Sequence, residues 1–115
     1  MSNTPEGRIK RKVVEVLKKH SVWYFFPASN GFGRAGIPDI IGIVDGRFFG
    51  IEVKADVKKK PTALQVKCGE EIRAAGGIWL LVRSKEDADA LGEMVEKLRS
   101  ERTNGNQTTE SVGNN

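Results

Sequence analysis

Apolar residues recur at helical spacing in three stretches of this chain and form short continuous runs in four others. The first helical stretch begins at Thr4-Pro5, a capping residue followed by the residue that favours the first helical position. The second begins at Thr62 and ends at Gly76-Gly77, and the third begins at Ser84. The apolar sides of these helices are expected to be Ile9, Val13, Val16 and Leu17; Leu64, Cys68, Ile72 and Ala75; and Ala88, Leu91, Met94, Val95 and Leu98.

The four apolar runs predict strands near residues 22–26, 39–44, 47–54 and 78–82. The resulting order, α-β-β-β-α-β-α, indicates an α/β protein with a small sheet flanked by helices and a further helix at the C-terminal end. We expect one domain over residues 1–101. Residues 102–115 are polar and poor in apolar side chains, and are expected to be a disordered tail.

Asp45-Gly46 lies between the second and third apolar runs, and this dipeptide is typical of a two-residue hairpin turn. Pairing Val44 with Arg47 then sets the register and brings Asp39 opposite Glu52. Directly opposite side chains have Cβ atoms about 4.5–5.5 Å apart. Lys54 shares a face with Glu52 because side chains alternate along a strand. The other hairpin residues are mostly apolar, so both sides of the hairpin are expected to be buried.

Two adjacent carboxylates repel each other and require compensation. A protonated carboxyl, the nearby lysine or a divalent cation could each provide it. Hard oxygen ligands completed by water and phosphate suit Mg²⁺ or Mn²⁺. Alternatively, Glu52 and Lys54 form a surface ion pair, and Asp39 caps a turn after Pro38. The register and the apolar flanks favour the metal site.

The glycines of "SNGFGRAGIPDIIG" have the spacing of a dinucleotide-binding turn at Gly31, Gly33 and Gly36. That turn requires a helix after the third glycine. Ile37-Pro38 and a β-branched run follow instead, and a residue before proline avoids helical geometry. We therefore expect a mobile loop that can approach a sugar-phosphate backbone and that leads into Asp39.

Charge and composition narrow the function classes further. The 19 Lys and Arg residues exceed the 15 Asp and Glu residues, giving a formal charge of +4 that favours an anionic partner. The single cysteine, Cys68, excludes an internal disulfide and a cysteine cluster for zinc, and is expected in the core. No apolar run reaches the roughly 20 residues of a membrane span, so no membrane partner is expected. An intracellular, cytoplasmic setting fits these features.

The set "GIPD", "GIEVK" and "PTALQ", in this order of elements, resembles the VRR-NUC (virus-type replication-repair nuclease) family of the PD-(D/E)xK nuclease superfamily. The similarity extends from about Pro5 to Val82. It implies a restriction-endonuclease-like αβββαβ core with a small mixed sheet, and makes residues 1–101 a single nuclease domain. It also implies a divalent-metal-dependent DNA endonuclease using Mg²⁺ or Mn²⁺. Archaeal Holliday-junction resolvases share the "PDII" and "EVK" elements.

The resemblance assigns roles to individual residues. It implies that Asp39 and Glu52 bind the metal, together with the backbone carbonyl of Val53. Lys54 matches the lysine that positions or activates the attacking water. Glu6 matches an acid of the first helix that helps to hold the metal or its water, and helical spacing places it on the inward side of that helix. Gln65 matches a family glutamine, although with Thr62 it also forms a capping box and could serve the helix start only.

Basic residues near these acids are candidates for phosphate contacts. Lys58, Lys59 and Lys60 follow the third strand, Arg34 lies in the glycine-rich loop, and Arg8 and Arg11 belong to a first helix in which six of the twelve positions 8–19 are basic. Plain solvation is the alternative for each. His20 is expected to interact with the helix C-terminus rather than to act as a base. Trp23 and Trp79 are expected in the core, although one exposed ring could stack on a base.

The leading hypothesis is an endonuclease that selects branched or junction DNA. A nucleic-acid-binding module with the same fold but no activity is the alternative, and a regulator that binds nucleotides through the glycine loop is a third possibility. A homodimer is expected because a chain of this size has little room for a specificity domain. Phage origin, with activity in the host cytoplasm, is an expectation from the resemblance.

Overall fold

The computed structural model describes residues 3–28 and 33–113. Helix α1 (Pro5–Lys19) is followed by strands β1 (Trp23–Phe25), β2 (Ile40–Val44) and β3 (Arg47–Val53). Helix α2 (Ala63–Ala74), strand β4 (Ile78–Val82) and helix α3 (Lys85–Gly113) complete the chain. This order confirms the predicted α/β class and the αβββαβ core with a further C-terminal helix.

The four strands form one mixed sheet in the order β1-β2-β3-β4. β1, β2 and β3 pair in antiparallel fashion, whereas β3 and β4 are parallel. Val44 pairs with Arg47 and Ile40 with Ile51, which confirms the hairpin register. Asp45 and Gly46 both have positive φ angles, 48° and 84°, as a type I′ turn requires. The turn therefore sets the register from which the two acids were predicted to meet.

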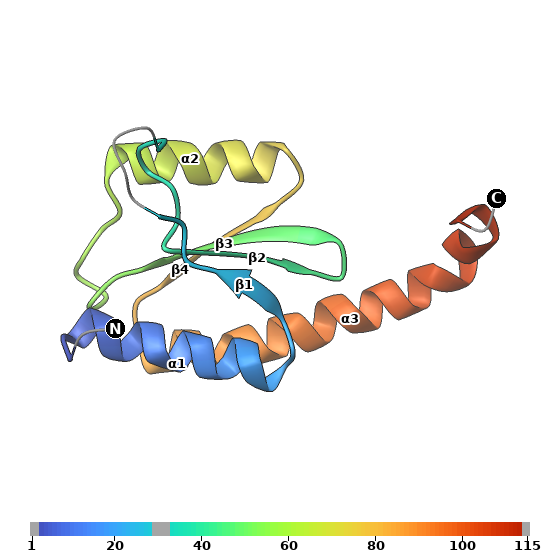
Figure 1. Ribbon diagram of the computed structural model, residues 1–115, viewed down its shortest axis with the longest axis horizontal. Helices are drawn as coiled ribbons and strands as arrows, with labels where there is room; N and C mark the ends of the chain where they lie inside the picture. The colour runs from blue at the N-terminus through green and yellow to red at the C-terminus, as the bar shows by residue number, and fades with distance from the viewer. Residues whose placement is uncertain (1–2, 29–32, 114–115) are drawn as a thin grey trace.

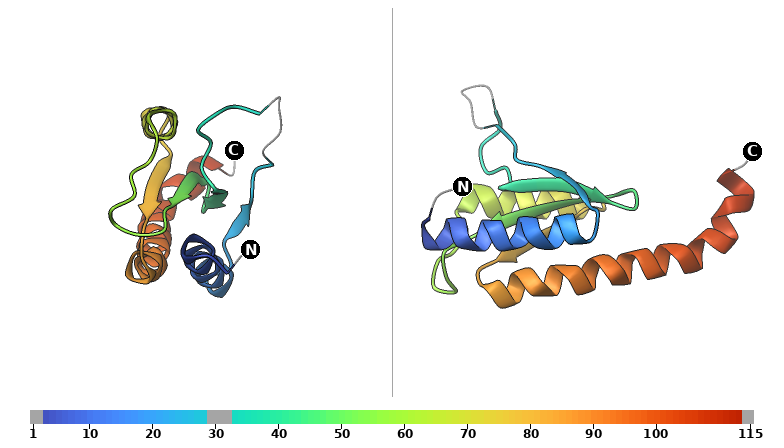
Figure 2. Two further views of the ribbon diagram at one scale, coloured as in Figure 1. Left: turned by 90° about the vertical axis from the view of Figure 1, so that its left-hand side faces the viewer. Right: turned by 60° about the horizontal axis from the view of Figure 1, so that its bottom comes forward.

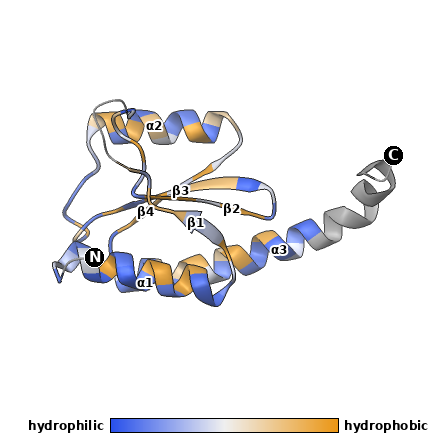
Figure 3. Ribbon diagram, in the orientation of Figure 1, coloured by the Kyte–Doolittle hydropathy of each residue, from blue (hydrophilic) through white to orange (hydrophobic). Residues whose placement is uncertain are grey.

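Helices cover both faces of the sheet (Figure 1). α1 and α3 pack against each other on one face, and α2 lies on the other against β3 and β4, as the end-on view in Figure 2 shows. The main core lies between the sheet and the α1–α3 pair, and the apolar strands and helix stripes that build it are orange in Figure 3. Its largest fully buried apolar side chains include Phe49, Leu17, Ile40 and Ile51.

The face of the sheet that carries α2 is covered only in part. α2 packs on β3 and β4, so the side chains of β1 and of the hairpin end remain exposed. Four of them form what we call the apolar patch: Trp23, Phe25, Ile43 and Phe48, which are 61%, 43%, 45% and 38% exposed. The expectation that both sides of the hairpin are buried is therefore wrong for its turn end. The core assignment is also wrong for Trp23, whereas Trp79 is buried.

Capping residues begin the first two helices as predicted. The Thr4 hydroxyl accepts a hydrogen bond from the Gly7 N–H, and Thr62 forms a complete capping box. The expected apolar side of α2 is only partly correct, because Leu64 and Ala75 are exposed while Cys68 is buried. The side of α2 that faces the sheet includes Gly69. A Cβ added at this position would lie 2.3 Å from the ring of Trp79 on β4.

α3 extends farther than the sequence predicted. Its backbone is helical to Gly113, whereas residues 102–115 were expected to form a disordered tail. Residues 102–113 contain no proline, and extending an existing helix costs less free energy than starting one. The domain boundary at residue 101 stays a prediction. Over the described residues, no helix combines the length and the apolar character needed to cross a bilayer.

Candidate active site at the open end of the hairpin

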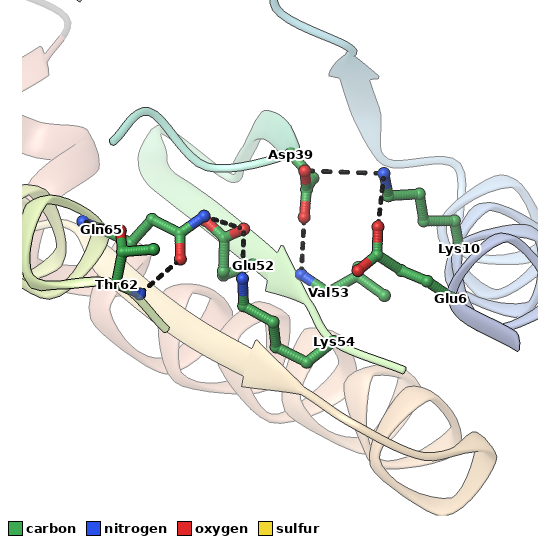
Figure 4. Close-up of polar contacts among 8 residues, drawn as sticks. All are labelled: Glu6, Lys10, Asp39, Glu52, Val53, Lys54, Thr62 and Gln65. Carbon is green, nitrogen blue, oxygen red and sulfur yellow. Dashed lines mark hydrogen bonds and ion pairs between the residues drawn. The ribbon is translucent and has the colours of Figure 1, made fainter. Parts of the chain in front are cut away.

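Asp39 and Glu52 lie at the end of the β2–β3 hairpin that is distant from its turn. Ile40 pairs with Ile51, so the next positions along the two strands are Asp39 and Glu52. The Asp39 carboxylate is oriented by the backbone, because its Oδ2 accepts a hydrogen bond of 2.8 Å from the Val53 N–H (Figure 4). The two acids are therefore adjacent, as the register predicted. A backbone hydrogen bond holds Asp39 next to β3, the strand that carries Glu52.

Glu52 is an ionisable residue buried inside the fold, with 1% of its surface exposed. Its Oε1 accepts a hydrogen bond of 2.9 Å from Gln65 Nε2 and lies 3.9 Å from the Lys54 ammonium. Its Oε2 is buried and has no hydrogen-bond partner among the described residues. When Glu52 is ionised, a buried oxygen that accepts no hydrogen bond is costly, because it has lost its water and gained nothing in return.

This environment raises the pKa of Glu52 from 4.5 to about 8. Burial is the largest cause, since it disfavours the charged form. The negative charge of Asp39 raises the pKa further, and so does a hydrogen bond between the protonated Glu52 carboxyl and Asp39. The positive charge of Lys54 lowers the pKa, and the negative charge of Glu6 adds to the rise. Without a bound cation, Glu52 therefore holds a proton at neutral pH.

Gln65 serves the helix start and the acid pair at the same time. Its backbone N–H donates to Thr62 Oγ1, and its side-chain Oε1 accepts from the Thr62 N–H at 2.8 Å. The same side chain uses its Nε2 to hold Glu52. The two roles that the sequence left as alternatives are therefore compatible, because the amide has an acceptor for one and a donor for the other.

Lys10 is a residue of this site that sequence reasoning missed. Its ammonium lies 3.6 Å from Asp39 Oδ1 and 3.4 Å from Glu6 Oε2, between the two carboxylates (Figure 4). The i, i+4 spacing from Glu6 was visible in the sequence, but the contact with Asp39 depends on how α1 packs on the sheet. Glu6 is 41% exposed rather than turned inward, and it reaches Asp39 only through Lys10.

Residues 33–39, which belong to the described part of the glycine-rich segment, form one wall of a cleft of about 680 Å³ beside Asp39. The cleft is lined by Lys10, Phe26, Arg34, Pro38 and Asp39, among others. Gly36 has a φ of 82°, and a Cβ there would lie 2.4 Å from the carbonyl oxygen of Leu64. At this position glycine is needed for close contact with the first turn of α2, and no helix follows it. Gly31 lies outside the described residues.

The predicted phosphate-binding residues fall into two groups. Lys58, Lys59 and Lys60 are exposed in the loop between β3 and α2, directly after the strand that carries the site. The others have protein partners: Arg34 pairs with Glu71 of α2, and Arg8 and Arg11 donate to Asn3. His20 caps the far end of α1, 3.9 Å from Glu96. Among the predicted phosphate-binding residues, Lys58, Lys59 and Lys60, which we call the lysine loop, are therefore the most open to a ligand.

The donor set fits a hard divalent cation. Two adjacent carboxyls, one with an unpartnered buried oxygen, provide oxygen ligands, and the Val53 carbonyl is a candidate third ligand. Within the described part of the chain, no three His, Cys, Asp or Glu side chains are grouped to hold a metal by themselves. Mg²⁺ and Mn²⁺ often bind through one or two carboxylates and complete their shell with water and phosphate. Direct ligation by Glu6 stays a prediction.

Comparison with solved structures supports this assignment of the fold. The chain is similar to a structure described as a VRR_NUC domain, with a TM-score of 0.69 and 28% sequence identity over 78% of this chain and 96% of that chain. The resemblance to the VRR-NUC family is confirmed. The VRR-NUC fold is nuclease-like, and its match covers nearly the whole of the solved domain. No family model and no curated protein matches the sequence.

Proposed function

We propose that this protein is a divalent-metal-dependent DNA endonuclease that acts on branched or junction DNA. The observation that supports the metal site most strongly is the buried Oε2 of Glu52, which lacks a partner at a position adjacent to Asp39. Lys54 beside this pair and the open cleft next to Asp39 support a hydrolytic role. The VRR-NUC fold supports the choice of nucleic acid as the substrate.

In this proposal Asp39 and Glu52 hold Mg²⁺ or Mn²⁺, with the Val53 carbonyl as a third ligand. Such a cation supplies Lewis-acid activation of the phosphate and lowers the pKa of the attacking water. The Val53 N–H keeps Asp39 oriented, and Gln65 keeps Glu52 oriented. Lys54, whose side chain is only 16% exposed, is placed to orient the water and to offset negative charge on the phosphate.

A digestion panel tests this function directly. Four-way junctions, flaps, nicked and linear duplexes and single strands are incubated with the protein in Mg²⁺, Mn²⁺ or EDTA. We expect cleavage of branched DNA in either metal, with products that carry 5′-phosphates, and no cleavage in EDTA. DNA binding without cleavage under every condition would instead favour a non-catalytic binding module.

The lysine loop is proposed to contact DNA phosphates. Each phosphate contact changes the logarithmic salt slope of duplex binding by about 0.9. We expect Lys58→Ala/Lys59→Ala/Lys60→Ala to reduce the slope by roughly 2–3 and to weaken binding to all DNA shapes alike, as fluorescence anisotropy over a salt series would measure. Lys97→Ala on α3 is the matched control. An unchanged slope in the triple variant would exclude this loop from the interface.

We also propose a homodimer formed through the apolar patch. The patch includes side chains of β1, which lies at the edge of the sheet, and edge strands beside exposed apolar surface favour association with another chain. A two-fold axis would place the patch against its own copy.

The dimer is tested by sedimentation at micromolar concentration. We expect a dimer for the wild type and a monomer for Trp23→Ser, because the substitution removes the most exposed apolar side chain of the patch. Val57→Ser, which changes an exposed apolar residue of the β3–α2 loop, is expected to remain dimeric. A wild type that sediments only as a monomer would contradict the proposal. The phage origin and host cytoplasmic setting stay predictions from the resemblance.

A further inference from the structure

The Lys10 ammonium lies where it neutralises two acids of the proposed site. It contacts Asp39 Oδ1 at 3.6 Å and Glu6 Oε2 at 3.4 Å, and 24% of its side chain is exposed. On the other side of the acid pair, Lys54 contacts Glu52. Each of the two central carboxyls therefore has its own lysine, and the lysines belong to different elements.

A divalent cation shared by Asp39 and Glu52 would change this balance of charge. Lys10 is within 4 Å of one of the proposed ligand atoms, so its positive charge would repel a cation bound there. The cation and the ammonium compete for the same carboxylate. Lys54 contacts Glu52 Oε1, whereas the unpartnered oxygen of that residue is Oε2, so Lys54 leaves an oxygen open to the cation.

Lys10 also lines the cleft beside Asp39. Its flexible four-carbon stem lets the ammonium leave Asp39 without movement of α1. The cleft is the open space next to Asp39, and Phe26 and Arg34 also line it. An ammonium displaced from Asp39 therefore reaches the space where a phosphodiester would approach the acid pair.

We propose that Lys10 is the internal counter-ion of the metal-free site, that a divalent cation displaces it from Asp39, and that it then contacts the DNA phosphate from the cleft. This inference rests on the proposed nuclease function. It assigns Lys10 a positioning role that combines the release of Asp39 with substrate binding. It also explains how Glu6 could reach the metal, since the displacement of Lys10 removes the group between Glu6 and Asp39.

Manganese binding without DNA tests the first half of the proposal. Mn²⁺ is titrated into the wild type, Lys10→Met and Lys12→Met, with free Mn²⁺ measured by electron paramagnetic resonance. Lys12 is the matched control, because it lies on the same helix but pairs with Glu15 and Asp89. We expect Lys10→Met to bind Mn²⁺ roughly two- to fivefold more tightly, as the loss of a partly exposed ion pair predicts. Lys12→Met should match the wild type.

DNA binding with Ca²⁺ in place of Mg²⁺ tests the second half, with Lys10→Gln as a second variant in case Lys10→Met does not fold. We expect both Lys10 variants to bind a four-way junction more weakly and to show a salt slope smaller by about 0.9. Equal or weaker Mn²⁺ binding in the Lys10 variants, or an unchanged DNA affinity, would overturn the inference while leaving the nuclease proposal intact. A wild type that binds no Mn²⁺ would overturn both.

Discussion

Asp39→Asn is expected to slow DNA cleavage by on the order of a thousandfold, since losing a ligand to a catalytic cation removes several kcal/mol of transition-state stabilisation. The fold should remain intact, because the asparagine oxygen can still accept the hydrogen bond that the Val53 N–H donates to Asp39. Single-turnover rates on a four-way junction in Mg²⁺ would measure the change, alongside thermal unfolding of both proteins.

Asp89→Asn is the matched control for this substitution. Asp89 is an exposed acid on α3 whose ion pair is with Lys12, away from the hairpin end. The Asp89→Asn variant should cleave DNA at the wild-type rate. An Asp39→Asn variant that cuts as fast as this control would mean that Asp39 has no part in the reaction.

Glu52→Gln is expected to make the metal-free protein more stable at pH 8 by about 2–4 kcal/mol. The folded state raises the pKa of Glu52 to about 8, so folding favours the protonated carboxyl. This contribution is fully present below the pKa of a free glutamate, near 4.3, and is lost as the pH rises toward 8. The full shift corresponds to about 5 kcal/mol. The expected gain is smaller, because the side-chain NH₂ of a buried glutamine also needs a hydrogen-bond partner.

Urea unfolding in EDTA at pH 5, 6, 7 and 8 measures this effect. The wild type should lose stability steadily across the series because the pKa of Glu52 is raised, whereas Glu52→Gln, with no charge to bury, should lose much less. Glu15→Gln, an exposed acid on α1, should follow the wild type. Parallel curves for all three proteins would show that Glu52 does not carry the pH dependence.

The same proton links pH to cation binding. A cation that binds the ionised Glu52 must release the proton held there, so affinity should rise with pH until the pKa of about 8 is passed. In the proposed site, Glu52 would thus destabilise the metal-free fold and stabilise the metal-bound protein. A buried acid that lowers the stability of the fold in this way is typical of a functional site and not of a residue that serves only to fill the core.

The parts of the site that depend on local geometry could be predicted from the sequence. Asp45-Gly46 defines a two-residue turn, and counting outward from it places Asp39 opposite Glu52 without any knowledge of the rest of the fold. The capping box at Thr62 was likewise visible, because its two hydrogen bonds join residues three apart. Such features can be predicted because they depend only on residues that are close together in the sequence.

The remaining parts depend on how separate elements pack. Lys10 reaches Asp39 because α1 packs on the sheet beside β3, and nothing in the spacing of residues along α1 determines that position. Trp23 is exposed because α2 covers β3 and β4 but not β1, although β1 is as apolar as a core strand. The hydrogen bond from Gln65 to Glu52 likewise depends on how closely α2 packs to β3, which the sequence does not reveal.

A crystal soaked in Mn²⁺ provides the most direct measurement of whether Asp39 and Glu52 share a cation. We expect one anomalous peak within about 2.5 Å of a carboxyl oxygen from each residue, with the Lys10 ammonium withdrawn from Asp39. The peak should be absent from Asp39→Asn crystals treated in the same way. A wild-type crystal in which these two carboxyls bind no manganese, while Lys10 stays on Asp39, would contradict the account.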